Sequence, residues 1–246
     1  MIPNYAELHC LTNYSFLRGA SHPEELVERA AGLGYSALAI TDECSVSGVV
    51  RAHVAAKDTR LKLIIGSEIT LADGMKLVLL VKDLRGYETL CGLITKARRA
   101  APKGEYLLAR EDFPPQVEGL VALWIPELGP RLHGGDGAWL ASRFPGNAFI
   151  AVELHRGADD AARIAELEAL GRELGLPCVA TGDVHMHERR RKRLQDVMTA
   201  VRQGCTLAEA GRSLQPNSER HLRSIGRLAA IHPARPAGSG PRAPRR

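Results

Sequence analysis

Residues 179–185 read Val179-Ala180-Thr181-Gly182-Asp183-Val184-His185, a short apolar run followed by two side chains that can bind a metal ion. Three other segments share this arrangement: Ala6-Glu7-Leu8-His9, Leu38-Ala39-Ile40-Thr41-Asp42-Glu43 and Leu63-Ile64-Ile65-Gly66-Ser67-Glu68. In a βα barrel, polar residues at the C-terminal ends of several strands gather on one face and form the active site. The repeated pattern therefore predicts a barrel with a polar site on that face.

Apolar runs and helical patterns alternate along the rest of the chain. Strands are expected at residues 36–41, 61–68, 76–82, 119–125, 148–154 and 177–181, and helices at residues 48–58, 85–99, 137–143, 158–174 and 188–203, after a first helix that ends near Leu33. The Asp73-Gly74 pair between two apolar runs predicts a hairpin that makes residues 69–71 and 76–82 antiparallel. The alternation favours a mainly parallel sheet, and about seven such units favour a closed or nearly closed barrel over an open sheet.

The apolar pattern of two helices predicts which side faces the sheet. In the helix at residues 48–58, the inner side is assigned to Val49, Val50, Ala52 and Val54. In the helix at residues 85–99, one apolar stripe is formed by Leu90, Leu93, Ile94 and Ala97.

Length and charge distribution bound the class of protein. A chain of 246 residues is normal for one βα barrel with a sizeable core. The formal charge of +5 arises at the C-terminus, where seven arginines and one acidic residue occur from Glu219 onward. The rest is nearly neutral, which argues against a generally basic nucleic-acid-binding protein. Beyond Ile231 the composition turns to Pro, Arg, Ala, Gly and Ser, so we expect a domain at residues 1–223 and a disordered basic tail at residues 224–246.

The lack of a recognisable targeting signal, together with the cysteine usage, predicts a soluble, cytoplasmic protein. No apolar run is long enough to span a bilayer, and the first residues lack the pattern of a signal peptide. The five cysteines have no paired short spacing, which indicates reduced thiols rather than a disulfide framework or a zinc knuckle.

The Asp183-Val184-His185 motif is the strongest local indication of a metal site. Side chains two residues apart on an extended strand end point the same way, so this pair can hold one divalent cation together with ligands from neighbouring strands. The alternative is a surface dipeptide that caps the following helix. Because His9, Asp42 and Glu68 occupy equivalent positions after other strands, the metal site is the favoured interpretation.

Longer motifs point to a known family. The opening Tyr5-Ala6-Glu7-Leu8-His9-Cys10-Leu11-Thr12-Asn13-Tyr14-Ser15-Phe16-Leu17-Arg18-Gly19-Ala20-Ser21 resembles the polymerase-and-histidinol-phosphatase (PHP) domain at the start of bacterial C-family DNA polymerases. Residues 37–42, 64–68, 82–87 and 180–185 follow in the family's order, and the resemblance covers about residues 5–223. Motifs such as Thr41-Asp42-Glu43-Cys44-Ser45 are similar to the error-prone, translesion branch. The resemblance implies a distorted (β/α)7 barrel, a TIM-like fold, with a three-metal site at the strand C-termini.

Departures from the family pattern imply that this metal site is incomplete. Leu11 and Glu43 stand where the family has histidines, Lys76 aligns with another histidine, and Arg18 aligns with an aspartate. The ligands that the resemblance leaves in place are His9, Asp42, Glu68, Asp183 and His185. Because a lysine and an arginine repel cations, we expect a vestigial site that hydrolyses no phosphate ester and holds at most one weakly bound divalent ion, zinc, manganese or magnesium.

The resemblance implies a function for a longer protein than this one. Relatives of this kind are DNA-directed DNA polymerases that act in damage-induced mutagenesis and translesion repair, and their partners are DNA and other replication proteins. Their catalytic palm lies beyond the residues present here, so we expect this chain to be inactive, as the product of a truncated or frameshifted gene. The alternatives are a stand-alone metal-dependent phosphoesterase or exonuclease, and a non-enzymatic module that binds polymerase or DNA.

Two further features remain open at the level of sequence. The basic run Arg189, Arg190, Arg191, Lys192 and Arg193 can contact nucleic-acid phosphates, or can form a solvated helix face, which is the more common situation. His155 follows an expected strand and can serve as a ligand or a phosphate-facing group, although a structural role is favoured.

Overall fold

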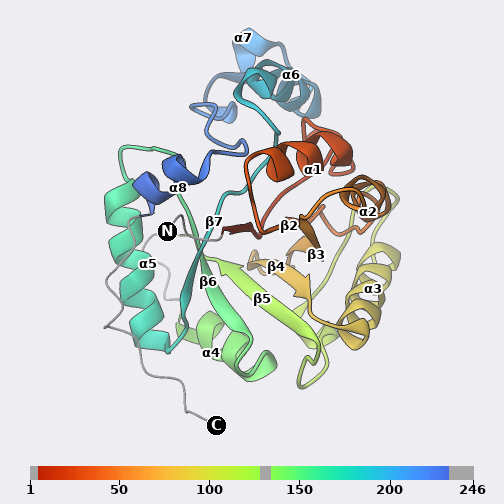
Figure 1. Cartoon of the computed structure of the whole chain (residues 1–246). Helices are drawn as coiled ribbons and strands as arrows, with labels where there is room; N and C mark the ends of the chain where they lie inside the picture. Colours follow the sequence, from red (N-terminus) through yellow and green to blue (C-terminus); the bar gives the residue numbers. More distant parts are fainter. Residues whose placement is uncertain (1–4, 128–133, 233–246) are drawn as a thin grey trace.

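A computed structural model describes residues 5–127 and 134–232 of the chain. Seven strands form one sheet in sequential order, and helices surround it (Figure 1). The strands are β1 (Ala6–Glu7), β2 (Ala37–Ile40), β3 (Lys62–Thr70), β4 (Lys76–Val81), β5 (Leu120–Ile125), β6 (Ala148–Glu153) and β7 (Cys178–Thr181). The α-helices are α1 (Pro23–Gly32), α2 (Val49–Ala56), α3 (Leu84–Arg99), α4 (Gly134–Arg143), α5 (Asp160–Leu174), α6 (Lys192–Gln203), α7 (Leu207–Ala210) and α8 (Ile225–Ile231). Short 3-10 turns occur at Arg110–Asp112, Arg189–Arg191 and Gly211–Ser213.

The sheet is parallel except around β4. Strands β1, β2 and β3 pair in parallel, as do β5, β6 and β7, whereas β4 is antiparallel to both β3 and β5. The predicted hairpin at Asp73-Gly74 produces this reversal. Gly74 has φ 90°, a conformation that favours glycine, and the Asp73 carboxylate accepts a hydrogen bond from the Met75 N–H at 3.0 Å. Because β4 runs backwards, its first residue, Lys76, lies at the C-terminal ends of the parallel strands.

The barrel is nearly closed, and residues just beyond β1 and β7 join its two edges. The Leu11 N–H donates to the Val184 carbonyl oxygen at 2.8 Å, and the Val184 N–H donates to the His9 carbonyl oxygen at 2.9 Å. The buried Glu7 carboxylate reinforces this seam, since it accepts hydrogen bonds from the Gly182 N–H at 2.8 Å and the Thr181 hydroxyl at 2.9 Å. The predicted nearly closed seven-unit barrel is therefore confirmed.

Alternation of side chains along the strands separates two apolar layers. Residues that point into the barrel form a small inner cluster of Ala39, Val78, Leu80, Leu123, Ile125 and Ala151. Their neighbours point outward into larger clusters under the helices, where Leu90, Leu93 and Ala97 of α3 pack as predicted. At the C-terminal end of the barrel the same inward positions carry Glu68, Lys76 and Glu153. The polar site thus continues the barrel interior.

The structure corrects two sequence-based expectations. Val50 and Val54 of α2 are mostly exposed, because the side of this helix that packs inward carries Val49, Ala52 and Ala56. The domain also extends past residue 223, since α8 follows directly and buries Leu228 in the core. Residues 233–246, the remainder of the predicted tail, lie outside the described residues. No helix in the described part of the chain is long and apolar enough to cross a membrane.

Candidate metal centre

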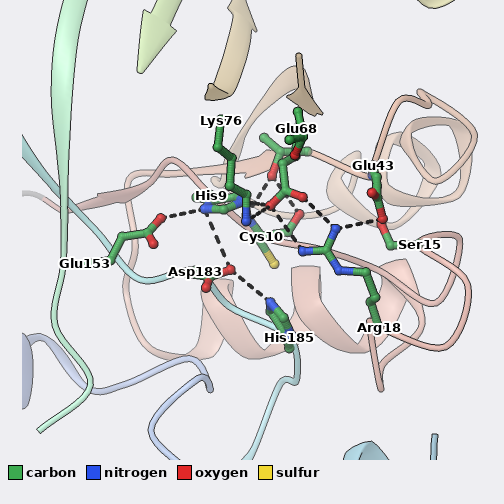
Figure 2. A network of polar contacts seen from close by, with 12 residues as sticks. His9, Cys10, Ser15, Arg18, Glu43, Glu68, Lys76, Glu153, Asp183 and His185 are labelled. Carbon is green, nitrogen blue, oxygen red and sulfur yellow. Dashed lines mark hydrogen bonds and ion pairs between the residues drawn. The ribbon is translucent and has the colours of Figure 1, made fainter. Parts of the chain in front are cut away.

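The polar site lies at the C-terminal end of the barrel and draws its side chains from most of the sheet. Glu68 comes from β3, Lys76 from the start of β4 and Glu153 from the end of β6. His9 follows β1, and Asp183 and His185 follow β7. Figure 2 shows these groups facing one another, with Arg18 and Glu43 at the rim.

His9 is the centre of the network. Its Nδ1 lies 2.7 Å from Glu153 Oε1, and its Nε2 lies 2.9 Å from Glu68 Oε2, with all three side chains buried. Burial lowers the pKa of a histidine, but the carboxylates of Glu153 and Glu68 outweigh it and raise the pKa of His9 above its ordinary value. The positive charge of His9 in turn outweighs the effect of burial on Glu153 and lowers the pKa of that carboxyl to about 2. Both ring nitrogens of His9 thus face carboxylate oxygens, which accept hydrogen bonds, and this arrangement favours the doubly protonated ring.

Glu68 is surrounded by cations. Arg18 Nη1 lies 2.5 Å from Glu68 Oε1, and Lys76 Nζ lies 2.8 Å from Oε2. Arg18 also reaches Glu43 Oε2 at 2.7 Å. Burial alone would raise the pKa of Glu68, but the hydrogen bond from His9 and the charges of Lys76 and Arg18 hold it well below the ordinary value. The two cations that the family resemblance aligns with metal ligands thus neutralise the carboxylate they face.

Asp183 and His185 meet by a route that differs from the prediction. Asp183 is not extended: its φ is 43°, in the left-handed region that aspartate tolerates better than most residues. His185 Nε2 donates to Asp183 Oδ1 at 2.9 Å, and His185 Nδ1 accepts from the Gln195 amide at 2.8 Å. Burial and the charge of Arg18 lower the pKa of His185 to about 3, so the ring is neutral. The second oxygen of Asp183 forms an ion pair with Arg220.

Asp42 follows β2 as expected, but the hydrogen bonds of its carboxylate go to the loop after β1 and not to His9 or Glu68. It accepts hydrogen bonds from the Thr12 N–H at 2.8 Å, the Thr12 hydroxyl at 2.8 Å and the Ser15 hydroxyl at 2.7 Å. Burial raises the pKa of Asp42, and these hydrogen bonds oppose that shift. Asp42 therefore anchors the loop after β1.

One acidic residue of the site was missed by the sequence prediction. In the described residues, the group whose ligand atoms lie within 4.8 Å of one another and could hold a metal ion is His9, Glu153 and Asp183. Glu153 follows the apolar run of β6, so it satisfies the rule that singled out Glu68. The prediction considered only His155 at this strand end. That ring donates from Nε2 to the Gly182 carbonyl oxygen at 3.1 Å, and burial together with Arg220 lowers its pKa to about 3.

These residues do not fit a three-metal centre. A metal ion binds neutral imidazole, whereas both nitrogens of His9 lie within hydrogen-bond distance of carboxylates, an arrangement that favours the protonated ring. Glu68 is held by Arg18 and Lys76, and Asp183 by Arg220. Leu11 is fully buried and has no donor atom. The carboxylates are thus already neutralised by side chains of the protein, and a single ion could enter only with loss of the His9 proton and displacement of Arg220.

The predicted nucleic-acid cluster is largely paired with acids of the same chain. Ion pairs join Arg189 to Glu219, Arg190 to Glu188, Arg191 to Glu25 and Lys192 to Asp196. Arg193 has no ion pair within the described residues and is exposed. Paired cations have less charge to offer to phosphates, so this arrangement favours the solvated helix face, and DNA contact by the cluster stays a prediction.

Comparison with known proteins gives the family of this chain. The family model of the PHP domain matches residues 7–133, just over half of the chain. The chain belongs to the PHP domain family. Among solved structures, an amidohydrolase from Chromobacterium violaceum with bound sulfate and no metal superposes with a TM-score of 0.52 at 17% identity, over 73% of this chain and 87% of that one. At this identity the likeness concerns the fold alone.

Curated relatives with much higher identity are polymerases. The error-prone DNA polymerase of Dechloromonas aromatica is 56% identical over 237 residues, which cover 94% of this chain and 23% of the relative. The error-prone DNA polymerase of Pseudomonas aeruginosa is 56% identical over 230 residues, which cover 93% of this chain and 22% of the relative. The chain therefore spans less than a quarter of the length of these polymerases.

Proposed function

We propose that this chain is the PHP domain of an error-prone DNA polymerase, and that it serves there as a structural domain without hydrolytic activity. The observation that carries the second part is the position of Arg18 and Lys76, both of which contact the buried carboxylate of Glu68. Their charges occupy the side of the site at which Glu68 would have to bind a metal ion. Arg220 does the same for Asp183.

The polymerase assignment is supported by the identity of 56% to relatives of that name across nearly all of this chain. On this proposal the longer protein carries out DNA synthesis in translesion repair, in the cytoplasm, with DNA and other replication proteins as partners. A chimera tests it: the Dechloromonas aromatica polymerase with its matched region replaced by this chain. Primer extension at a rate within threefold of the parent enzyme is expected, and a soluble, folded chimera without extension would contradict the assignment.

The absence of hydrolysis is tested on the chain alone. Zinc and manganese, which suit imidazole and carboxylate ligands, should show no tight binding by calorimetry, and a model phosphodiester should not be hydrolysed. Incubation with a chelator should leave the thermal midpoint unchanged, because the barrel has its own core and its internal cations need no metal. A diesterase activity lost on chelation, or unfolding by the chelator, would contradict the proposal.

A variant that is expected to gain metal binding complements these negative results. Arg18→Asp together with Lys76→His removes both cations from Glu68 and supplies a carboxylate and an imidazole. We expect zinc affinity to rise at least tenfold. The matched control is Lys57→His with Arg60→Asp, which makes the same change of residue types at two exposed positions. An equal rise in the control would attribute the gain to overall charge and contradict the reasoning.

The alternative is a single weakly bound divalent ion at His9, Glu153 and Asp183, which is supported by the closeness of their ligand atoms. Such binding would require the His9 proton to leave. It would therefore weaken steeply as the pH falls, and calorimetric titrations at pH 6 and pH 8 distinguish this state from a site that holds no ion.

A further inference from the structure

Helix α6 is amphipathic, and its apolar side faces solvent. The exposed fractions are 41% for Leu194, 44% for Val197 and 60% for Val201, and Met198 is half-buried between them. These residues recur at spacings of three and four, so they form one stripe along the helix, which we call the α6 stripe. Figure 1 shows α6 and α7 at the top of the molecule, beyond α1 and away from the strands.

The side of α6 that faces the rest of the domain carries two polar residues and only one small apolar residue. Gln195, Thr199 and Ala200 are buried there. The Gln195 amide donates to His185 Nδ1 at 2.8 Å, and the Thr199 hydroxyl donates to the Gln195 carbonyl oxygen at 2.9 Å. A helix that only covered its own domain would turn its apolar stripe inward. The Thr199 bond lies within α6, so the Gln195 bond to His185 is the one that joins the helix to the barrel site, and the apolar stripe is left for another surface.

The charged residues at the edges of the α6 stripe indicate the charge expected on the surface that covers it. Arg193 and Arg202 lie on either side of the stripe, are exposed, and have no ion pair among the residues that the structure describes. A second copy of this chain would bring the same arginines against each other, which disfavours self-association. A partner with an apolar patch bordered by Asp or Glu would instead complement both the stripe and its borders.

The polymerase relatives have further protein in the same polypeptide. The region that this chain matches is 22 to 23% of their length, so more than three quarters of each relative is additional protein attached to this domain. Resting on the proposed function, we propose that the α6 stripe docks on the remaining polypeptide of the polymerase, on an apolar surface bordered by acidic side chains.

Cysteine accessibility tests this docking in the chimera defined above. Val201→Cys places a thiol at the C-terminal end of the α6 stripe, at its most exposed residue, and Glu173→Cys places a matched control on the exposed side of α5. Labelling by a maleimide is followed by peptide-resolved mass spectrometry, which separates these thiols from the native cysteines. We expect labelling at position 201 to be at least tenfold slower in the chimera than in the isolated chain, and labelling at position 173 to change less than twofold.

The charged borders are tested in the same assay. Adding Arg193→Glu and Arg202→Glu to the Val201→Cys chimera should speed labelling at least threefold, because these arginines would then face acidic groups with like charge. Equal labelling of position 201 in the chimera and the isolated chain overturns the proposal. So does protection in the isolated chain that grows with its concentration, which would indicate a second copy, or protection that appears only with DNA.

The outcome for docking is independent of the outcome for the proposed function. A chimera that extends a primer but labels freely at position 201 overturns the docking and leaves the polymerase assignment intact. A chimera that is protected at position 201 but does not extend a primer supports the docking and contradicts the assignment.

Discussion

Replacing Glu68 by glutamine should destabilise the domain more than any other single amide substitution at the site. The carboxylate is 1% exposed and contacts His9 at 2.9 Å, Lys76 at 2.8 Å and Arg18 at 2.5 Å. Glu68→Gln keeps the shape but removes the charge that three cationic groups share. Arg18 retains Glu43, whereas Lys76 loses its carboxylate partner.

The size of the effect follows from burial. Breaking a buried ion pair from one side costs about 3 to 5 kcal/mol, and we expect the lower end, near 3 kcal/mol, because Arg18 and Lys76 are partly exposed and can turn to solvent. For a domain of this size that corresponds to a fall in Tm of roughly 6 to 12 °C. Glu43→Gln is the matched control, since Glu43 is 32% exposed and such a pair contributes about 1 kcal/mol or less.

The pH dependence of the difference identifies its cause. The pKa of Glu68 is depressed in the folded state, so its contribution is complete above the ordinary glutamate pKa of about 4.3 and is lost as the pH falls below it. Each pH unit below that value removes about 1.4 kcal/mol, so the deficit of Glu68→Gln should shrink by about 1 kcal/mol between pH 7 and pH 3.5. Urea unfolding followed by circular dichroism measures both values. A deficit below 1 kcal/mol at pH 7, or one that is the same at both pH values, would refute the reasoning.

Three further outcomes are expected. Glu7→Ala should cost about 1 to 3 kcal/mol in urea unfolding, because it removes the Oε1 acceptor of the Gly182 N–H and the Thr181 hydroxyl at the seam of the barrel. An unchanged midpoint would show that the seam does not depend on this side chain. Asp42→Asn should lower the free energy of unfolding by a similar amount, about 1 to 3 kcal/mol, and should leave zinc affinity unchanged. A weaker zinc affinity in calorimetry would show that Asp42 is a metal ligand. The purified 246-residue chain should not extend a primer. Nucleotidyl transfer needs metal-bound carboxylates, and the candidate ligands in the described residues are paired with cations of the same chain. Template-dependent extension in a gel assay would contradict this prediction.

Sequence alone was sufficient where the information is local. Apolar runs placed the seven strands, and the Asp73-Gly74 turn predicted the one reversed strand, because backbone preferences of neighbouring residues determine both. The rule that polar residues end barrel strands brought His9, Glu68, Asp183 and His185 into one network. The amphipathic pattern correctly predicted the buried side of α3 but not that of α2, which has more apolar residues than its neighbours cover.

Tertiary structure decided which of these groups meet and in what protonation state. Glu153 meets the strand-end rule, but only the fold shows that β6 brings it to His9. Arg220, distant in sequence from the other residues of the site, reaches Asp183 because the segment before α8 folds back over the barrel. Asp42 has the sequence position of a ligand, yet its carboxylate accepts hydrogen bonds from two hydroxyls of the loop after β1. Strand pattern specifies the end of the barrel at which a side chain lies, whereas its partner and its charge depend on the few ångströms that separate it from groups brought in by distant segments.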